Sequence, residues 1–255
     1  MNENALREEG LLEEGETLDA LFGGRLYFIQ AKLGYRFSVD AVLLAALCGA
    51  QAGARALDLG CGSGVVGIIL AGLSLVDSAA GVEIQPGLAG MARRNVAING
   101  LESKVEIVEA DLREPDIGLE PGSFDLAVAN PPFREPGSGR VNPDEEKALA
   151  RHEIAGSLED FLAAAHRLLK PKGAFSAIYP ARRLAHAARV VEDAGFALKT
   201  LWPIFSRPEE EGRLFVFTAT KGGSPGVKIM PPFYIYGSKG EYSPRMEAFL
   251  RGEMG

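Results

Sequence analysis

The stretch Ala56-Leu57-Asp58-Leu59-Gly60-Cys61-Gly62-Ser63-Gly64 decides the fold of this chain. Its apolar first half is typical of a buried strand, and the residues that follow it are typical of a helix. Glycines at positions 60, 62 and 64 let the backbone turn sharply and approach a ligand that any Cβ atom would block. The pattern therefore predicts a ligand-binding turn between a strand and a helix.

The sequence around this turn alternates short apolar runs with helical patterns, which is typical of βαβ units on a parallel sheet. Strands are predicted at 55–59, 79–84, 104–109, 124–129 and 173–179. Helices are predicted at 39–47, 64–73, 86–99, 157–169 and 181–194. Two late strands, 195–202 and 213–220, predict an antiparallel edge. We therefore expect an α/β fold with a seven-stranded, mostly parallel sheet.

The N-terminal region is predicted to extend this fold. Residues 1–20 carry seven acidic side chains and one basic side chain, so we expect a solvated lead-in that ends in a short helix. The run 24–38 has alternating apolar residues around a turn at 32–35, which predicts a β-hairpin. These patterns divide the chain into an N-terminal extension (1–50) and a main domain (51–255).

Length and composition exclude several classes of protein. The chain has 255 residues, 47% hydrophobic and 24% charged, which is typical of globular proteins and not of disordered or fibrous ones. It has two cysteines and no His/Cys cluster, so neither a disulfide framework nor a metal site is expected. With no secretory signal or membrane span visible, we expect a soluble cytoplasmic protein. The net charge of −7 disfavours binding to a nucleic-acid duplex over a broad surface, but it allows a local cluster of basic side chains around a pocket.

Acidic residues at predicted strand ends indicate which ligand the glycine turn binds. Glu83 follows Gly64 by 19 residues, where a carboxylate can accept both hydroxyls of a ribose. Asp58 opposes a phosphate but favours a ligand with an ammonium and a sulfonium, which indicates S-adenosylmethionine rather than NAD. Asp111 can accept from an adenine amino group, with Leu112 as apolar packing. The alternatives are a tight turn with an incidental acid and, for Asp111, a solvated strand-end cap.

A second motif, Asn130-Pro131-Pro132-Phe133, follows the strand predicted at 124–129. The two prolines hold the chain extended and rigid, so the Asn130 side-chain oxygen and the Pro131 carbonyl become two fixed acceptors. Acceptors on the hydrogens of a nucleobase amino group accommodate the charge that develops when this poor nucleophile is alkylated. Phe133 can stack on a base taken out of its helix or loop. A double-proline turn without chemistry is the alternative.

The glycine turn resembles motif I of class I S-adenosylmethionine-dependent methyltransferases, and 130–133 resembles the Asn-Pro-Pro-aromatic motif of their amino-methylating branch. This resemblance covers about 54–220. The segments 30–44, 151–153 and 233–236 further resemble the bacterial valine-tRNA adenine-N6 methyltransferase family. The resemblance implies a Rossmann-like class I methyltransferase fold, S-adenosylmethionine as cofactor, and N6 methylation of an anticodon-loop adenine in a tRNA.

Two further assignments differ in their basis: that of the segment at Phe37 rests on the resemblance, and that of the residues around the end of the acceptor motif rests on their residue types. Phe37 and Asp40 match the segment that lies over the methionine end of the cofactor in similar methyltransferases; a core aromatic and a helix cap are the alternatives. The loop 134–151 is expected to cover the substrate base, or to be simply solvated. Pro132 and three arginines are the expected substrate-binding residues, the arginines as phosphate contacts: Arg134, Arg140 and Arg151.

The sequence therefore predicts an S-adenosylmethionine-dependent adenine-N6 methyltransferase acting on tRNA, with Asn130, Pro131 and Phe133 as the catalytic residues. Within this class, the alternatives are N5 methylation of a protein glutamine and N6 methylation of an rRNA adenine. An NAD-dependent oxidoreductase and a non-catalytic RNA-binding module represent other classes. Neither motif indicates which tRNA is modified, or the oligomeric state.

Overall fold

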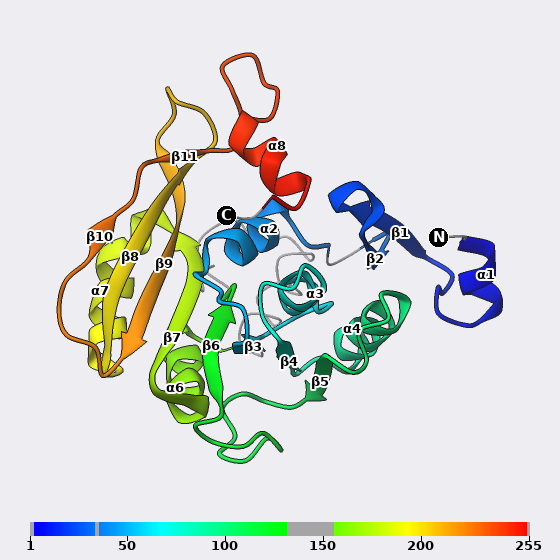
Figure 1. The fold of residues 1–255 in the computed structure, drawn as a ribbon, viewed down its shortest axis with the longest axis horizontal. Coiled ribbons are helices and arrows are strands. Elements are labelled where there is room, and N and C mark those ends of the chain that lie inside the picture. The colour runs from blue at the N-terminus through cyan, green and yellow to red at the C-terminus, as the bar shows by residue number, and fades with distance from the viewer. Residues whose placement is uncertain (1–2, 34–35, 132–155, 254–255) are drawn as a thin grey trace, which may run out of the picture.

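A nine-stranded sheet forms the centre of the computed structural model, which describes residues 3–33, 36–131 and 156–253 (Figure 1). The seven long strands lie in the order β5 (Val105–Glu109), β4 (Ser78–Glu83), β3 (Arg55–Leu59), β6 (Phe124–Ala129), β7 (Leu169–Pro180), β9 (Gly212–Lys221) and β8 (Phe196–Phe205). Of these, β9 runs antiparallel to both of its neighbours, β7 and β8. Two short strands, β10 (Lys228–Ile229) and β11 (Phe233–Tyr234), extend the sheet beyond β8. The predicted α/β fold, mostly parallel with an antiparallel side, is confirmed.

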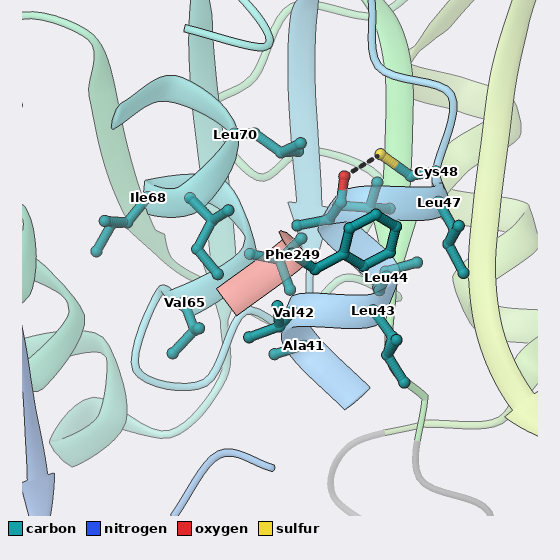
Figure 2. Close-up of a cluster of buried hydrophobic side chains, with 14 of the residues drawn as sticks. Ala41, Val42, Leu43, Leu44, Leu47, Cys48, Val65, Ile68, Leu70 and Phe249 are labelled. Carbon is teal, nitrogen blue, oxygen red and sulfur yellow. Dashed lines mark hydrogen bonds between the residues drawn. The ribbon is translucent and has the colours of Figure 1, made fainter. Parts of the chain in front are cut away.

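Helices cover both faces of this sheet because its strands alternate apolar side chains between two clusters. On β3, Ala56 joins a cluster with helices α2 (Val39–Leu47), α3 (Val65–Gly72) and α8 (Pro244–Leu250), whereas Leu57 and Leu59 join one with α6 (Leu158–Leu168) and α7 (Leu184–Asp193). Figure 2 shows side chains of α2, α3 and α8 meeting in the first cluster. The glycine turn that follows β3 therefore starts from a strand buried on both faces.

Strand β7 differs from its prediction by starting at Leu169 instead of residue 173. Leu169 pairs with Phe124 of β6, and the register then shifts until Ala174 pairs with Leu126. Lys172, inside this irregular stretch, has φ +65°, a conformation that the side-chain pattern does not reveal. At the other end of β7, a 3-10 turn, η2 (Ala181–Arg183), precedes α7.

The N-terminal hairpin pairs different residues from those predicted. Strand β2 (Leu26–Ala31) lies where it was expected, but its partner is β1 (Glu16–Leu21), and the turn is at η1 (Phe22–Gly24). The predicted second arm is wrong because Ser38 caps α2 instead, accepting a hydrogen bond from the amide of Asp40. Charges obscured β1 in the sequence: Glu16 is paired with Arg94, and Asp19 with Arg36.

The acidic lead-in was predicted as a solvated segment that ends in a short helix, but the helix comes at its start and two of its leucines are buried. It contains α1 (Glu3–Glu8), and Leu6 and Leu12 are buried against Met91 and Ile98 of α4 (Pro86–Ile98). Figure 1 shows α1 and the hairpin beyond α4, at the opposite end of the molecule from β8. The division at residue 50 stays a prediction.

No helix within the described ranges combines the length and the apolar character that a membrane crossing requires.

Candidate active site

The carboxyl ends of β3, β4 and β6 meet at one edge of the sheet. Leu59, the last residue of β3, pairs with Val82 of β4 on one side and with Ala129 of β6 on the other. The glycine turn therefore leaves the sheet between Glu83 and Asn130. The chain continues from β3 to β4 and β5 in one direction and from β6 to β7 in the other. Such a reversal of strand order is where open α/β sheets bind ligands.

The glycine turn has the backbone conformation that its sequence predicts. Gly60, Gly62 and Gly64 have φ values of 65°, 57° and 81°, in the left-handed region that favours glycine. A Cβ atom on Gly60 would lie 3.1 Å from the ring of Phe161, and one on Gly64 would lie 3.2 Å from the Cβ of Ala92. Gly60 is exposed. The turn is therefore packed against α6 and α4 and is exposed only at Gly60, since residues 61–64 are buried.

Asp58 is buried at the end of β3, with 3% of its surface exposed. The amide of Gly67 in α3 donates to its Oδ2 atom at 3.0 Å. Burial raises the pKa of Asp58 to about 7, and the charge of nearby Glu83 adds to this rise, while the hydrogen bond from Gly67 opposes it. The carboxyl group thus anchors α3 and is held close to its titration point at neutral pH.

Glu83, at the end of β4, is buried and connects β4 to the glycine turn. Its Oε2 atom accepts from the amide of Gly62 at 2.9 Å, and its Oε1 atom accepts from the amide of Gln85 at 2.9 Å. A carboxylate has about four acceptor positions, so both oxygens can accept further bonds. Its contact with a ribose stays a prediction.

The structure places Asp111 just after β5, where Arg113 already binds it. The Nε atom of Arg113 lies 2.9 Å and 3.0 Å from the two carboxylate oxygens, and Nη2 lies 2.6 Å from one of them. The hydrogen bonds from Arg113 hold the pKa of Asp111 below its ordinary value. Leu112 is buried in the hydrophobic core with Ile117 and Leu119. An adenine amino group would have to share Asp111 with Arg113, so the predicted adenine contacts stay predictions.

Phe37 and Asp40 lie on either side of the N-cap of α2. The ring of Phe37 packs edge-on against Phe28 with 5.4 Å between ring centroids, and its amide donates to Oε1 of Gln30 at 3.0 Å. Burial raises the pKa of Asp40. Helix α2 packs against α3, so the fold brings this segment to the helix that follows the glycine turn. Contact with a cofactor stays a prediction for both residues.

The acceptor motif is described as far as its second residue. Asn130 is half-buried directly after β6, and its side chain makes no hydrogen bond to any residue that the structure describes. Pro131 is buried. Among the described residues, none therefore competes for the side chain of Asn130 beside the glycine turn, and its contact with a substrate stays a prediction. The other predicted catalytic and substrate-binding residues lie outside the described residues: Pro132, Phe133, Arg134, Arg140 and Arg151.

Two exposed arginines at this edge were missed by the sequence analysis. Arg182 follows β7 within η2, and Arg213 lies beside the β9 residue Leu214 that pairs with Pro180 of β7. Neither forms an ion pair with another described residue. Position in the chain was the available signal: Arg182 comes shortly after a strand predicted to be parallel, and Arg213 lies at the start of an antiparallel strand, so both belong to the same edge as Asn130.

A pocket of about 250 Å³ lies at the opposite, amino edge of the sheet, beneath the starts of β3, β6 and β7. Its charged side chains already have partners, since Lys170 contacts Asp125 at 2.6 Å and Lys172 donates to the carbonyl of Gly222. Within the described ranges, no group of three or more His, Cys, Asp and Glu side chains could hold a metal ion. The carboxyl edge is therefore the candidate active site.

Known proteins with this fold define its class. A predicted O-methyltransferase from Agrobacterium tumefaciens has a TM-score of 0.69 at 22% identity, over 85% of this chain and 97% of that one. M. jannaschii TYW2 in complex with AdoMet has a TM-score of 0.55 at 18% identity, over 82% and 86% of the two chains. The fold is that of the class I methyltransferases. The family model described as "Methyltransferase small domain" matches residues 38–193, more than half of the chain. The chain belongs to this methyltransferase family.

Several curated relatives have the name tRNA1(Val) (adenine(37)-N6)-methyltransferase. The protein from Bacteroides thetaiotaomicron is 33% identical over 150 residues, which is 58% of this chain and 61% of the relative. The protein from Dyadobacter fermentans is 25% identical over 224 residues, 87% of this chain and 91% of the relative. The first alignment thus spans about three fifths of its relative's length. The predicted resemblance to this family is confirmed.

The cofactor that the family implies, S-adenosylmethionine, fits the described residues around the turn. Asp58 and Glu83 are both buried, and no Lys or Arg among the described residues pairs with either. Buried carboxylates without a positive partner favour a cationic ligand and oppose the two phosphates of a dinucleotide. The exposed backbone of Gly60 gives such a ligand a surface free of side-chain atoms.

Proposed function

We propose that this chain is an S-adenosylmethionine-dependent methyltransferase that modifies the N6 amino group of an adenine in the anticodon loop of a tRNA. The observation that carries the proposal is the half-buried Asn130 side chain, to which no described residue bonds, beside a glycine turn and two buried carboxylates that no described Lys or Arg pairs with. The shared name of the curated relatives supports tRNA as the substrate. A tRNA substrate also implies a cytoplasmic location.

The cofactor side of the proposal assigns one task to each residue at the ends of β3 and β4. S-adenosylmethionine, when bound, supplies an electrophilic methyl group on a positively charged sulfur. The turn from Gly60 to Gly64 receives it against the backbone, and Glu83 accepts from its ribose hydroxyls. The negative charge of Asp58 favours the ammonium and sulfonium groups. Phe37 and Asp40 cover the methionine end.

The acceptor side explains how a weak nucleophile reacts. The lone pair of an exocyclic amino group is delocalised into its ring, so attack on a methyl carbon requires the nitrogen to become pyramidal and partly positive. The Asn130 side-chain oxygen and the Pro131 carbonyl accept its two hydrogens and stabilise that charge. The extra proton leaves to water after transfer. Phe133 stacks on the adenine, which has left its loop to reach the site.

The RNA is held by local basic contacts in this proposal. Arg134, Arg140 and Arg151, which follow the acceptor motif in the sequence, contact phosphates, and Arg182 and Arg213 add contacts at the end of β7 and the start of β9. A net charge of −7 favours this limited rim over a broad electrostatic surface.

Methyl-labelled S-adenosylmethionine tests the substrate directly. The purified protein is incubated separately with tRNA, rRNA and protein from one extract, and the products are digested and analysed by mass spectrometry. We expect N6-methyladenosine in the tRNA sample. Label in rRNA, or on a glutamine of the protein sample, would reject tRNA as the substrate while leaving the methyltransferase assignment intact.

A further inference from the structure

The edge of β2 that faces away from β1 forms hydrogen bonds with asparagine side chains at α4 instead of with a third strand. On β2, the amide and carbonyl of Tyr27 bond to Oδ1 and Nδ2 of Asn99, at 2.9 Å and 2.7 Å. The amide and carbonyl of Ile29 bond to Oδ1 and Nδ2 of Asn95, at 2.6 Å and 3.2 Å. Each asparagine thus satisfies one donor and one acceptor of the strand edge. These bonds fix the register of β2 against α4.

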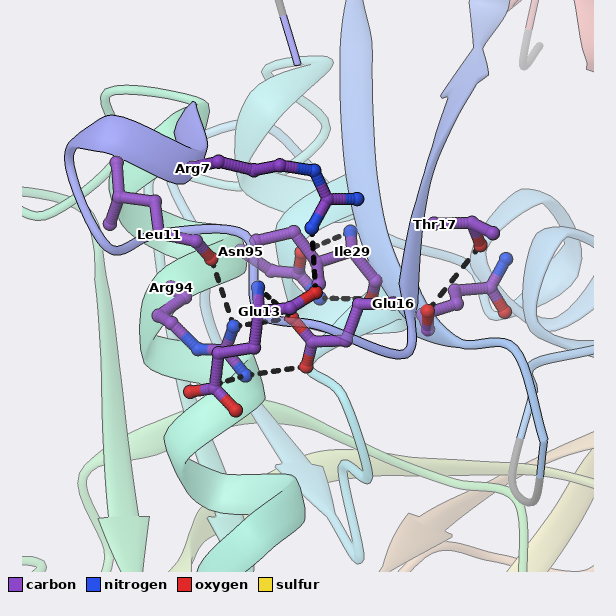
Figure 3. A network of polar contacts seen from close by, with 9 residues as sticks. Arg7, Leu11, Glu13, Glu16, Thr17, Ile29, Arg94 and Asn95 are labelled. Carbon is purple, nitrogen blue, oxygen red and sulfur yellow. Dashed lines mark hydrogen bonds and ion pairs between the residues drawn. The ribbon is translucent and has the colours of Figure 1, made fainter. Parts of the chain in front are cut away.

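The spacing of the two asparagines matches the repeat of the strand. Four residues of helix rise about 6 Å, and two residues of strand advance about 6.6 Å, so Asn95 and Asn99 meet successive outward-facing peptide groups of β2. Arg94 of α4 strengthens the contact by binding Glu16 at 2.6 Å and the Leu11 carbonyl at 2.8 Å (Figure 3). The hairpin is therefore anchored to α4 by both its strands.

Asn95 has one bond that links the hairpin to the candidate active site. Its Nδ2 atom also donates to the carbonyl of Ser63 in the glycine turn, at 3.0 Å. Asn95 is fully buried, so water does not compete for these bonds. The third bond of Asn99 instead goes back to the Asn95 carbonyl in its own helix, at 2.7 Å. The two asparagines make the same number of bonds and differ in whether they reach the turn.

The next residue of β2 holds the other segment predicted to cover the cofactor. Gln30 is buried, and its Oε1 atom accepts from the amide of Phe37 at 3.0 Å. Its Nε2 atom donates to Asp19 of β1, so the side chain is fixed from both ends. Adjacent residues of one strand thus support the glycine turn and the Phe37 segment.

We propose that the hairpin β1–β2 is a positioning element of the cofactor site, with Asn95 holding the glycine turn through Ser63 and Gln30 holding the segment at Phe37. This inference rests on the proposed cofactor. It gives the N-terminal region a task in binding S-adenosylmethionine without requiring that it touch the cofactor.

The matched pair Asn95→Leu and Asn99→Leu tests this role. Both variants keep the shape of the side chain and lose three hydrogen bonds, and we expect both to lower the melting temperature. In isothermal titration calorimetry, Asn95→Leu should weaken S-adenosylmethionine binding about tenfold, whereas Asn99→Leu should weaken it less than about threefold. Equal Kd values in the two variants would overturn the positioning role.

A measurement on the wild-type protein covers the case in which Asn95→Leu does not fold. If Asn95 couples the glycine turn to β2, a ligand that binds at the turn must also stabilise the hydrogen bond between Asn95 and the Ile29 amide. Saturating S-adenosylmethionine should therefore slow hydrogen exchange of the Ile29 amide more than that of the Tyr27 amide. Equal slowing of the two amides, or none, would overturn the inference. If the wild-type protein binds no S-adenosylmethionine, the proposed cofactor is overturned, and this inference with it.

Discussion

The polar side chains on the two sides of the strand-order reversal differ in whether they have hydrogen-bond partners within the described protein. On the β3–β4 side, the carboxylates of Asp58 and Glu83 are already bonded to backbone amides of the turn and of the helix that follows. On the β6 side, the side chain of Asn130 has no partner among the described residues. In the proposed function, the first side receives the cofactor and is already bonded within the protein, whereas the second side, called the acceptor side, bonds the substrate. The predictions below test this difference.

The largest effect is expected on the acceptor side. Asn130→Ala removes one of two acceptors for the amino group, and methyl transfer should fall about 10²–10³-fold, as when one preorganised oxyanion donor is removed. The Kd for S-adenosylmethionine should change less than about twofold, since the cofactor side keeps its own bonds. Single-turnover transfer rates and calorimetry measure the two quantities. Activity near that of the wild type would show that the acceptor side is not catalytic.

Asp58→Asn tests the charge on the cofactor side. The folded protein keeps a proton on Asp58 up to a pKa of about 7, whereas the unfolded chain releases it near 3.8. This group therefore lowers the free energy of unfolding by about 3 kcal/mol as the pH rises from about 4 to 7. The variant lacks that decrease, and urea unfolding across this range measures the difference between the two proteins.

The same titration predicts a pH dependence of cofactor binding. A cationic ligand favours the ionised carboxylate, so the wild-type Kd for S-adenosylmethionine should decrease as the pH rises through about 7. The Asp58→Asn variant should bind more weakly and without this dependence. Identical pH profiles in the two proteins would contradict the assignment of Asp58 to the cofactor side.

A smaller effect is expected from a methyl group in the glycine turn. Gly60→Ala places a Cβ atom at positive φ and 3.1 Å from Phe161, which should cost about 1–2 kcal/mol of stability. Gly90→Ala is the control, since Gly90 lies in α4 with nothing within 4 Å of its Cβ position, and it should stabilise the protein by about 0.5–1 kcal/mol. Denaturant unfolding compares the two. Equal stability changes would mean that the turn relaxes freely.

The smallest effect is expected from Arg182 and Arg213, the two exposed arginines (the rim) at the carboxyl edge of the sheet. Arg182→Ala and Arg213→Ala should each raise the KM for tRNA a few-fold and reduce the slope of log affinity against log salt by about one. Arg189→Ala is the control, because this exposed arginine lies further along α7, away from the edge. A salt dependence unchanged in both rim variants would remove them from the RNA contact.

The local sequence predicted the position and limits of the central strands, which are buried on both faces of the sheet. The strands at 55–59 and 124–129 have the predicted limits, because a short apolar run flanked by turn residues leaves few alternatives. The glycine turn was predictable for the same reason, since few residues other than glycine adopt those φ values. The first arm of the hairpin was not predictable in this way: Glu16 is a buried strand residue whose charge is paired with Arg94, far along the chain.

The sequence by itself determined the strand–turn–helix unit, the family and the candidate ligand-binding residues at strand ends, because each depends on residues that are neighbours in the chain. Only the tertiary structure decided that Asn95 joins the hairpin to the turn and that Arg94 pairs with Glu16. An asparagine or an arginine has the same local pattern whether it faces solvent or a buried carbonyl, and its partner is fixed only when distant segments pack together.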